Sequence, residues 1–304
     1  MRFLLALLMV LVLPVGVFAQ EGEQVQVREP LREPLRERVT VKGRIVNERG
    51  EAVEYVQVGV PRLQIGTIST VDGRFEMTTP LDTLQFFHVS YQVAAYPVTG
   101  AAEDVVIVLR EQELPPAVFI GGDTKEKYLV KPGVKISERI GGADFYRPGG
   151  GGKGSELGCI ARVRKPFLIQ DIQFTILNNY IPGCVASINV YRIEEETEAF
   201  VNVLHKPMYC HILESETPRD YDIQPEETIL LEPGKYFVAL QIVATDDAAV
   251  QKILETPEAE RNPRALHMAT ALYFKSSYER YSAMGKMMKI PVNIGVSVKG
   301  LEYQ

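Results

Sequence analysis

The amino-acid sequence predicts an all-β fold built from two β-sandwich modules and one short helix. Apolar and polar residues alternate with a period of two in many short segments, as in strands that bury one face. Turn residues separate these segments at intervals of about 8–12 residues, which is typical of β-sandwiches. A helical pattern is confined to residues 246–254, where early Asp residues suit the positive N-terminus of a helix.

The N-terminus has the features of a secretory signal peptide. Arg2 precedes an unbroken apolar run over residues 3–12. Residues 17–19, Val-Phe-Ala, place small or modest side chains at the positions that a signal peptidase reads. The apolar run is short for a membrane anchor, which needs about 20 residues. We therefore expect residues 1–19 to direct export to the periplasm or the cell surface, with cleavage before Gln20.

Residues 20–38 are predicted to be a charged, semi-rigid linker. The sequence Arg-Glu-Pro-Leu occurs twice in tandem over residues 28–35. Repeated prolines exclude a regular helix and favour extended backbone in the residues before them. Few apolar side chains are present, so the segment cannot build a core. A docking peptide for a partner is the alternative interpretation.

Residues 39–111 are predicted to form the first sandwich. Val39, Val41 and Ile45 alternate with polar residues, as in a half-buried strand. Turn chemistry at residues 71–74 precedes Phe75 and Met77, which share one face. Other segments with strand patterns are Val56, Val58 and Val60, then Leu84, Phe86 and His88, and finally the apolar run at residues 105–109.

Several short motifs in this unit point to a known family. They are residues 41–46, Gly50, residues 56–58, Gly66-Thr67 and above all Asp72-Gly73-Arg74-Phe75. The unit resembles the carboxypeptidase-regulatory-like domain, a transthyretin-like β-sandwich common in exported proteins of the Bacteroidetes. Family members usually carry Thr-Asp-x-x-Gly-x-Phe at the last motif, whereas here Thr70-Val71 precede Asp72 and the first acidic position is missing. The resemblance implies a non-catalytic module that is attached to many different partners.

Residues 112–154 are predicted to connect the two units. Paired glycines and prolines, and the glycine run at residues 149–152, break any long element. Short strands are expected near residues 118–120 and 128–130. The glycine run does not complete a phosphate-binding loop, because Gly154 stands where that motif needs Ser or Thr. A flexible hinge is the better interpretation, and no nucleotide cofactor is expected.

Residues 155–304 are predicted to form a larger sandwich. Leu157, Cys159, Ala161 and Val163 share one face of an alternating segment. Further strands are expected around residues 172–176, 188–192, 208–212, 228–231, 236–243 and 292–298.

The motifs at residues 154–158, 174–176, 189–191 and 273–277 make this half similar to the C-terminal region found after regulatory-like domains in uncharacterised Bacteroidetes envelope proteins. That resemblance implies a jelly-roll-like sandwich.

Reactive clusters are not evident, so we predict no catalytic, cofactor-binding or metal site. His205, Cys210 and His211 are close in sequence, but Cys210 and His211 would point to opposite faces of a strand. The apolar surroundings of Cys159, Cys184 and Cys210 favour buried thiols, and a disulfide between two of them is the alternative in an exported protein.

The best candidate for a binding surface is the tyrosine-rich segment 273–281, because tyrosine is rigid, amphipathic and suited to interfaces. Its predicted contact residues are Tyr273, Tyr278, Arg280 and Tyr281, and ordinary strand packing is the alternative. The net charge of −6 and the lack of a dense basic block disfavour nucleic acid, and predict at most a peripheral association with membranes.

Together these features predict an exported, non-catalytic protein of the cell envelope. It would act as a structural module or bind an envelope protein or polymer. One alternative is an accessory binding protein for polysaccharide or peptide uptake at the outer membrane. The other is a hydrolase whose active-site residues come from distant segments, since such sites are defined by geometry and not by spacing.

Overall fold

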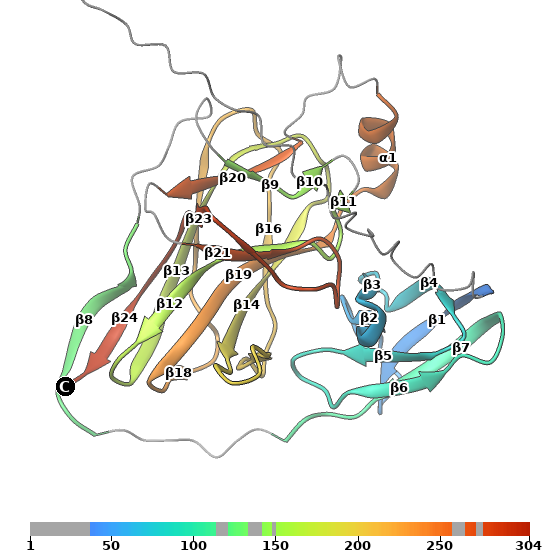
Figure 1. The fold of residues 1–304 in the computed structure, drawn as a ribbon, viewed down its shortest axis with the longest axis horizontal. Helices are drawn as coiled ribbons and strands as arrows, with labels where there is room; N and C mark the ends of the chain where they lie inside the picture. The colour runs from blue at the N-terminus through green and yellow to red at the C-terminus, as the bar shows by residue number, and fades with distance from the viewer. Residues whose placement is uncertain (1–36, 114–120, 133–141, 148–149, 257–264, 272–275) are drawn as a thin grey trace, which may run out of the picture. The chain divides into compact units, whose positions relative to one another are not determined.

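The computed structural model describes residues 37–113, 121–132, 142–147, 150–256, 265–271 and 276–304, and these residues confirm an all-β fold (Figure 1). The predicted signal peptide, nearly all of the linker and the strand expected near residues 118–120 lie outside the described residues. Residues Glu37–Gln304 form one compact unit. Among the described elements no helix is long and apolar enough to cross a membrane.

The first sandwich consists of two small sheets whose inner faces share one core. Ile45 and Phe75 come from one sheet and Leu84 and Phe86 from the other, and all four are buried in that core. The rings of Phe75 and Phe86 meet edge to face with their centroids 5.3 Å apart. In the described part, one sheet has the order β4 (Arg74–Pro80), β1 (Arg38–Asn47), β7 (Ala102–Leu109), and the other β3 (Ile65–Ile68), β2 (Gln57–Val60), β5 (Thr83–Phe87), β6 (Ala94–Pro97). The 3₁₀ helix η1 (Pro61–Leu63) joins β2 to β3.

The turn that carries the family resemblance has a structural role. Thr70 Oγ1 donates a hydrogen bond to Asp72 Oδ1 at 2.5 Å, and Arg74 Nε lies 2.9 Å from Asp72 Oδ2. The hydrogen bond from Thr70 lowers the pKa of Asp72, and the charge of Arg74 adds to this effect. Gly73 has φ of 76°, which favours glycine, and its carbonyl accepts from the backbone N–H of Ile45 at 2.8 Å. These residues therefore hold β4 beside β1.

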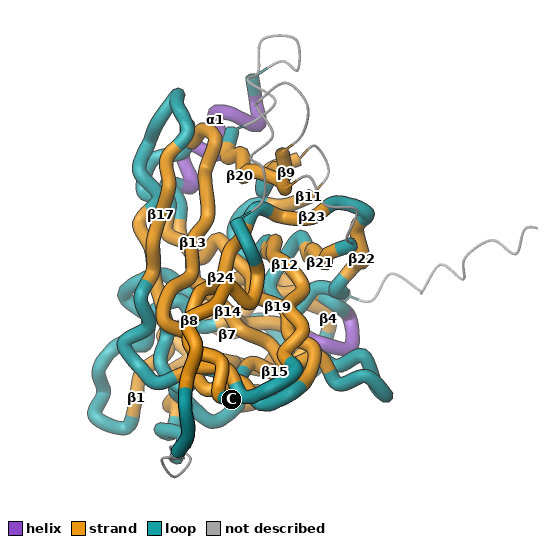
Figure 2. The backbone as a smooth tube through the Cα atoms, turned by 90° about the vertical axis from the view of Figure 1, so that its left-hand side faces the viewer, coloured by secondary structure: helices purple, strands orange, loops and turns teal. Residues whose placement is uncertain are grey.

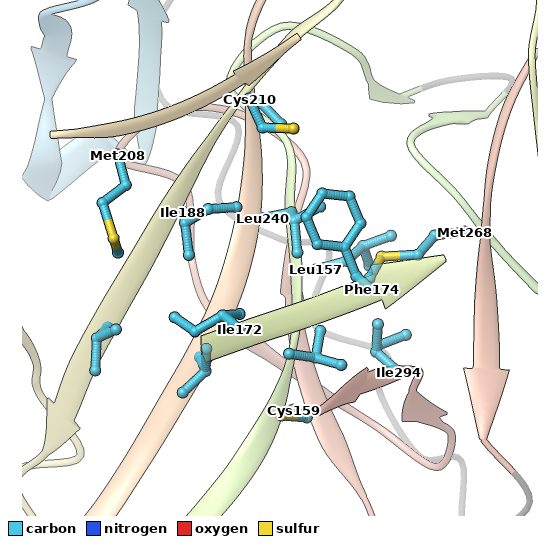
Figure 3. Packing of buried hydrophobic residues seen from close by; sticks show 14 of the residues in the cluster. Leu157, Cys159, Ile172, Phe174, Ile188, Met208, Cys210, Leu240, Met268 and Ile294 are labelled. Atoms are coloured by element: carbon cyan, nitrogen blue, oxygen red, sulfur yellow. The ribbon is translucent and has the colours of Figure 1, made fainter. Parts of the chain in front are cut away.

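The second sandwich packs two larger sheets against each other (Figures 1 and 2). Leu157 and Cys159 of one sheet lie in the same core as Ile172 and Phe174 of the other, which confirms the predicted inward faces (Figure 3). In the described part, the seven-stranded sheet runs β15 (Phe200–Asn202), β14 (Val185–Ile193), β19 (Gly234–Ala244), β12 (Glu156–Val163), β21 (Ser277–Arg280), β22 (Met288–Ile290), and β16 (Met208–His211) also pairs with β14. The eight-stranded sheet, counted in the same way, runs β23 (Asn293–Ile294), β20 (Leu266–Ala271), β13 (Phe167–Asn179), β24 (Val296–Tyr303), β8 (Thr124–Val130), with β17 (Arg219–Ile223) and β18 (Ile229–Leu231) on β13 and β9 (Gly142–Asp144) on β20.

Part of the predicted connector belongs to the second sandwich. β8 pairs with β24 at a sheet edge, and β9 pairs with β20. The glycine run includes β11 (Gly150–Gly151), which pairs with β10 (Tyr146–Arg147). Gly154 has φ of 89° and approaches the backbone nitrogen of Ala283 so closely that a Cβ atom would overlap it. The described part of this stretch is therefore packed and is not a free hinge. The exposed, charged side chains along β8 explain why no alternation marks it.

Along β19, the seven-stranded sheet is buried on both faces. Its outer face includes Phe237, Ala239, Gln241 and Val243 of β19, none of which is more than 2% exposed. Tyr55 and Ile68 of the first sandwich pack in one cluster with Val243, and Phe200 and Tyr278 pack in another cluster with Phe237. Polar side chains on this covered face must find partners inside the protein, because an unpaired buried polar group is costly.

The predicted helix is confirmed as α1 (Asp247–Glu255), with Asp246 as its N-cap. The Asp246 carboxylate accepts a hydrogen bond from the backbone N–H of Ala249 at 3.0 Å. We expect Asp246→Ala to lower the free energy of unfolding by about 1 kcal/mol, because one N–H group at the helix start loses its partner. Urea denaturation measures the change. Asp246→Asn keeps a cap and should stay close to the wild-type value, whereas equal losses in the two variants would contradict the capping role.

Candidate functional site

The four residues of the predicted binding surface do not form one exposed patch. Tyr273 lies outside the described residues. Tyr278 is half-buried on β21, and Arg280 at the end of that strand is only 8% exposed. Tyr281 is 37% exposed, and its hydroxyl donates a hydrogen bond to Glu279 Oε1 at 2.7 Å. Arg280 is therefore an interior residue, and the reason lies in its ion pair.

Tyr278 belongs to an aromatic cluster on the outer face of the seven-stranded sheet, with Tyr191, Phe200 and Phe237. The Phe200 and Tyr278 rings meet edge to face with centroids 5.0 Å apart. Lys235 Nζ lies 5.7 Å from the centroid of the Tyr278 ring, within the range of a cation–π contact. Tyr278 thus contacts both the buried aromatic cluster and the charged side chain of Lys235.

Arg280 is part of a buried polar network that consists of Gln57, Glu156, Asn189, Tyr191 and Arg280. The register of β12 and β21 places Glu156 directly opposite Arg280, and Arg280 Nε lies 2.7 Å from Glu156 Oε2. Glu156 Oε1 accepts hydrogen bonds from Asn189 Nδ2 at 2.8 Å and from the Tyr191 hydroxyl at 3.0 Å. Burial, together with the charge of Glu156, raises the pKa of Tyr191 well above its ordinary value, so this hydroxyl stays a donor.

Two motifs identified in the sequence thus come together in space. Glu156 lies within the Gly-Ser-Glu-Leu-Gly motif on β12, and Asn189 and Tyr191 flank Val190 on β14, which β19 separates from β12 in the sheet. Because Asn189 and Tyr191 are two residues apart on β14, they project from the same face of the sheet. The carboxylate between them is completely buried. These motif residues serve a structural ion pair and its hydrogen bonds.

The network reaches into the first sandwich. Arg280 Nη2 donates to Gln57 Oε1 at 3.4 Å, and it donates to the Tyr191 hydroxyl at 3.1 Å. Gln57 lies on β2 and is 8% exposed. One guanidinium therefore bonds to side chains from both sandwiches, and the contact between the two is specified by hydrogen-bond geometry as well as by apolar packing.

A second set of contacts surrounds His88. Its Nε2 lies 3.3 Å from the Tyr209 hydroxyl, and its Nδ1 accepts from the backbone N–H of Ser90 at 3.2 Å. The Ser90 hydroxyl donates to the carbonyl of His205 at 2.9 Å, and the rings of Tyr55 and Tyr209 meet edge to face at 5.0 Å. Burial lowers the pKa of His88 to about 4. The imidazole is therefore neutral at ordinary pH in this contact.

The other candidate ligands are spread apart. Cys210 is buried and His211 is exposed, so the two point to opposite faces of β16 as predicted. His205 Nδ1 lies 3.9 Å from Glu227 Oε2. In the part of the chain that the structure describes, no three His, Cys, Asp or Glu side chains are grouped to hold a metal ion.

The cysteines are buried thiols, as the apolar pattern predicted. Burial raises the pKa of Cys184 to about 12 and that of Cys210 to about 11. A thiol with such a pKa is a poor nucleophile at neutral pH, because the thiolate is the reactive form.

One pair has the geometry of a histidine held by a carboxylate. His267 Nδ1 lies 2.6 Å from Asp144 Oδ1, and the histidine is 1% exposed. The β9–β20 register places these two residues opposite each other. Such a pair orients the base of many hydrolases, but a base must also reach a substrate. Burial of His267 on all sides favours a structural role.

A large groove lies on the second sandwich, with a volume of about 870 Å³. Residues of β8, β12 and β22 line it, together with Lys235 at the start of β19. Its cationic side chains are Lys127, Lys131, Arg162, Arg164, Lys235 and Lys289. We call this surface the basic groove.

Sequence reasoning missed this groove because its cations come from segments far apart in the chain. The one local signal was the alternation of Arg162 and Arg164 with the core residue Val163.

Comparisons with solved structures find members of one family among the matches. The chain is similar to the crystal structure of a DUF3823 family protein from Parabacteroides merdae ATCC 43184, with 10% identity and a TM-score of 0.21 over 85% of this chain and 98% of that one. It is also similar to a DUF3823 family protein from Bacteroides ovatus ATCC 8483, with 10% identity and a TM-score of 0.20 over 68% of this chain and 97% of that one. No protein-family model and no curated protein matches the chain.

Proposed function

We propose that this chain is an exported, non-catalytic module of the cell envelope, in which the first sandwich is a rigid adaptor and the second is the recognition surface. The observation that carries the proposal is the buried polar network, in which Arg280 bonds to Gln57 of the first sandwich and to Glu156 and Tyr191 of the second. Gln57 is the partner from the first sandwich, so another arrangement of the two sandwiches would remove a hydrogen bond from a buried guanidinium.

The sequence supports the envelope as the site of action. Arg2, the apolar run at residues 3–12 and the small residues before Gln20 are those of a secretory signal. In the first sandwich, the turn motif at residues 72–75 resembles that of the carboxypeptidase-regulatory-like domain, and this resemblance implies a non-catalytic module attached to varied partners. Both features favour a module that positions another surface, and they disfavour an enzyme.

Cell fractionation and co-sedimentation test this proposal. We expect the natural protein in the envelope fraction with Gln20 at its N-terminus. We also expect the purified mature chain to sediment with at least one of three preparations: peptidoglycan sacculi, outer-membrane vesicles or envelope polysaccharide. Full-length protein in the cytoplasm, or sedimentation with none of the three preparations, would contradict the proposal.

A hydrolase is the competing function, and the Asp144–His267 pair is the observation that favours it. The variant His267→Gln distinguishes the two. Turnover of an ester, peptide or glycoside substrate that this substitution abolishes would replace our proposal with the enzyme. Envelope binding that the substitution leaves unchanged supports the module.

A further inference from the structure

The basic groove has a charge opposite to that of the whole chain. Six cationic side chains line it, against one acidic residue, Glu302, among the described lining residues. Glu302 pairs with Lys127 at 2.5 Å, so the other five cations have no acid opposite them within the groove lining. The protein as a whole carries a formal charge of −6. A concave surface with this local excess attracts anions even though the whole protein does not.

Strand register adds a second, independent observation. Arg162 on β12 lies directly opposite Lys235 on β19. Like charges in directly opposed positions of an antiparallel pair destabilise the sheet. Lys289 on β22 lies opposite Tyr278, whose ring Lys235 also approaches. The strand pairing thus places Arg162 opposite Lys235 and brings Lys289 and Lys235 to the same tyrosine. A bound anion would offset the repulsion between these cations.

The lining also indicates the class of anion. Arginine forks match carboxylate and sulfate groups, and cations spread over four strands and their ends suit a ligand with repeated charges. Tyr128, Leu129 and Ile160 contribute apolar surface between the charges, which suits the faces of sugar rings. The volume is within the range of about 300–1,000 Å³ that is typical of ligand pockets, so a short stretch of polymer fills it.

Nucleic acid fits this surface less well. Single strands are held by several aromatic side chains on which successive bases stack, whereas Tyr128 is the one aromatic residue among the described lining residues.

We propose that the basic groove binds a segment of acidic polysaccharide through its carboxylate or sulfate groups. This inference rests on the proposed function, because it names the ligand class of the recognition surface. Arg162, Arg164 and Lys289 contact the acidic groups, and Tyr128 packs against a sugar ring.

Calorimetric titration of the mature chain with four probes tests the inference. The probes are an oligogalacturonate, a sulfated heparin oligosaccharide, a neutral malto-oligosaccharide and a single-stranded oligodeoxynucleotide. We expect binding of at least one acidic saccharide, weakening with added salt, and the two acidic probes separate carboxylate from sulfate recognition. The double variant Arg162→Gln, Arg164→Gln should weaken binding by roughly tenfold. The matched control Arg110→Gln, Lys206→Gln removes two exposed cations outside the groove and should change affinity less than about twofold.

Thermal unfolding without ligand supplies a second readout. Arg162→Gln alone should not lower the melting temperature, because it removes the repulsion with Lys235. Equal binding of the neutral saccharide, tighter binding of the oligonucleotide, or equal losses in the groove and control variants would each overturn the inference. If no acidic probe binds, the inference fails, while sedimentation of the wild type with sacculi or vesicles would leave the proposed function standing.

Discussion

Replacing Arg280 by Met is expected to lower the free energy of unfolding by about 3–5 kcal/mol, because it leaves the Glu156 carboxylate buried without its countercharge. Glu156 is completely buried, and its remaining donors are Asn189 and Tyr191. Two neutral hydrogen bonds do not replace the ion pair at 2.7 Å. Urea denaturation at neutral pH measures the loss.

The double variant Glu156→Gln, Arg280→Met is the sharper test of the same prediction. It removes both charges and should recover much of the stability that Arg280→Met loses, since no unpaired charge remains buried. Lys42→Ala provides the surface comparison, because Lys42 pairs with Glu76 at 3.1 Å with both side chains largely exposed. That substitution should cost less than about 1 kcal/mol. If Arg280→Met costs no more than Lys42→Ala, the network does not hold the two sandwiches together.

The strands themselves were predictable because their evidence is local. Leu157, Cys159 and Ala161 alternate along β12, and each lies in the core where the period of two placed it. The helix start at Asp246 was predictable for the same reason, since a cap involves residues three positions apart. Such features depend on neighbours in the chain and require no knowledge of the tertiary fold.

Burial of the second sheet face was not predictable, since it depends on what covers that face. The apolar runs of β7 and β19 have similar patterns, yet Val106 and Val108 on β7 are 63% and 52% exposed while Phe237 and Ala239 on β19 are fully buried. The outer face of β7 is exposed to solvent, whereas the outer face of β19 is covered by other parts of the chain. From the sequence alone, Glu156 is therefore predicted to lie on the surface. Its burial follows only from the tertiary fold, in which the distant residue Arg280 lies opposite it.

The same limit explains why Arg280 was assigned to a binding surface and why the basic groove was missed. A tyrosine-rich segment with an arginine has the composition of an interface. Strand register decides otherwise: it places Arg280 opposite Glu156 on the covered outer face and Arg162 opposite Lys235. Register between distant strands is not encoded in any single segment. Composition alone therefore assigned Arg280 to an exposed binding surface, although it lies in a buried network.

Acidification from about pH 7 to about pH 4 is expected to destabilise the chain by about 3 kcal/mol through His88 alone. In the folded chain burial lowers the pKa of His88 to about 4, against an ordinary value of 6.5. Between these two pH values the unfolded chain binds a proton that the folded chain does not. Stability from the neutral imidazole is therefore complete above about pH 6.5 and is lost as the pH falls towards 4.

Comparison with variants isolates this contribution from the carboxylates that also titrate. His88→Gln removes the titrating group, so its free energy of unfolding should fall less steeply between pH 7 and pH 4 than that of the wild type. His211→Gln removes an exposed histidine and should keep the wild-type slope. Parallel curves for the wild type and His88→Gln would show that His88 is not buried as neutral imidazole. Because His88 packs against Tyr209 of the second sandwich, protonation acts at the contact between the two sandwiches, and acid should separate them before either core unfolds.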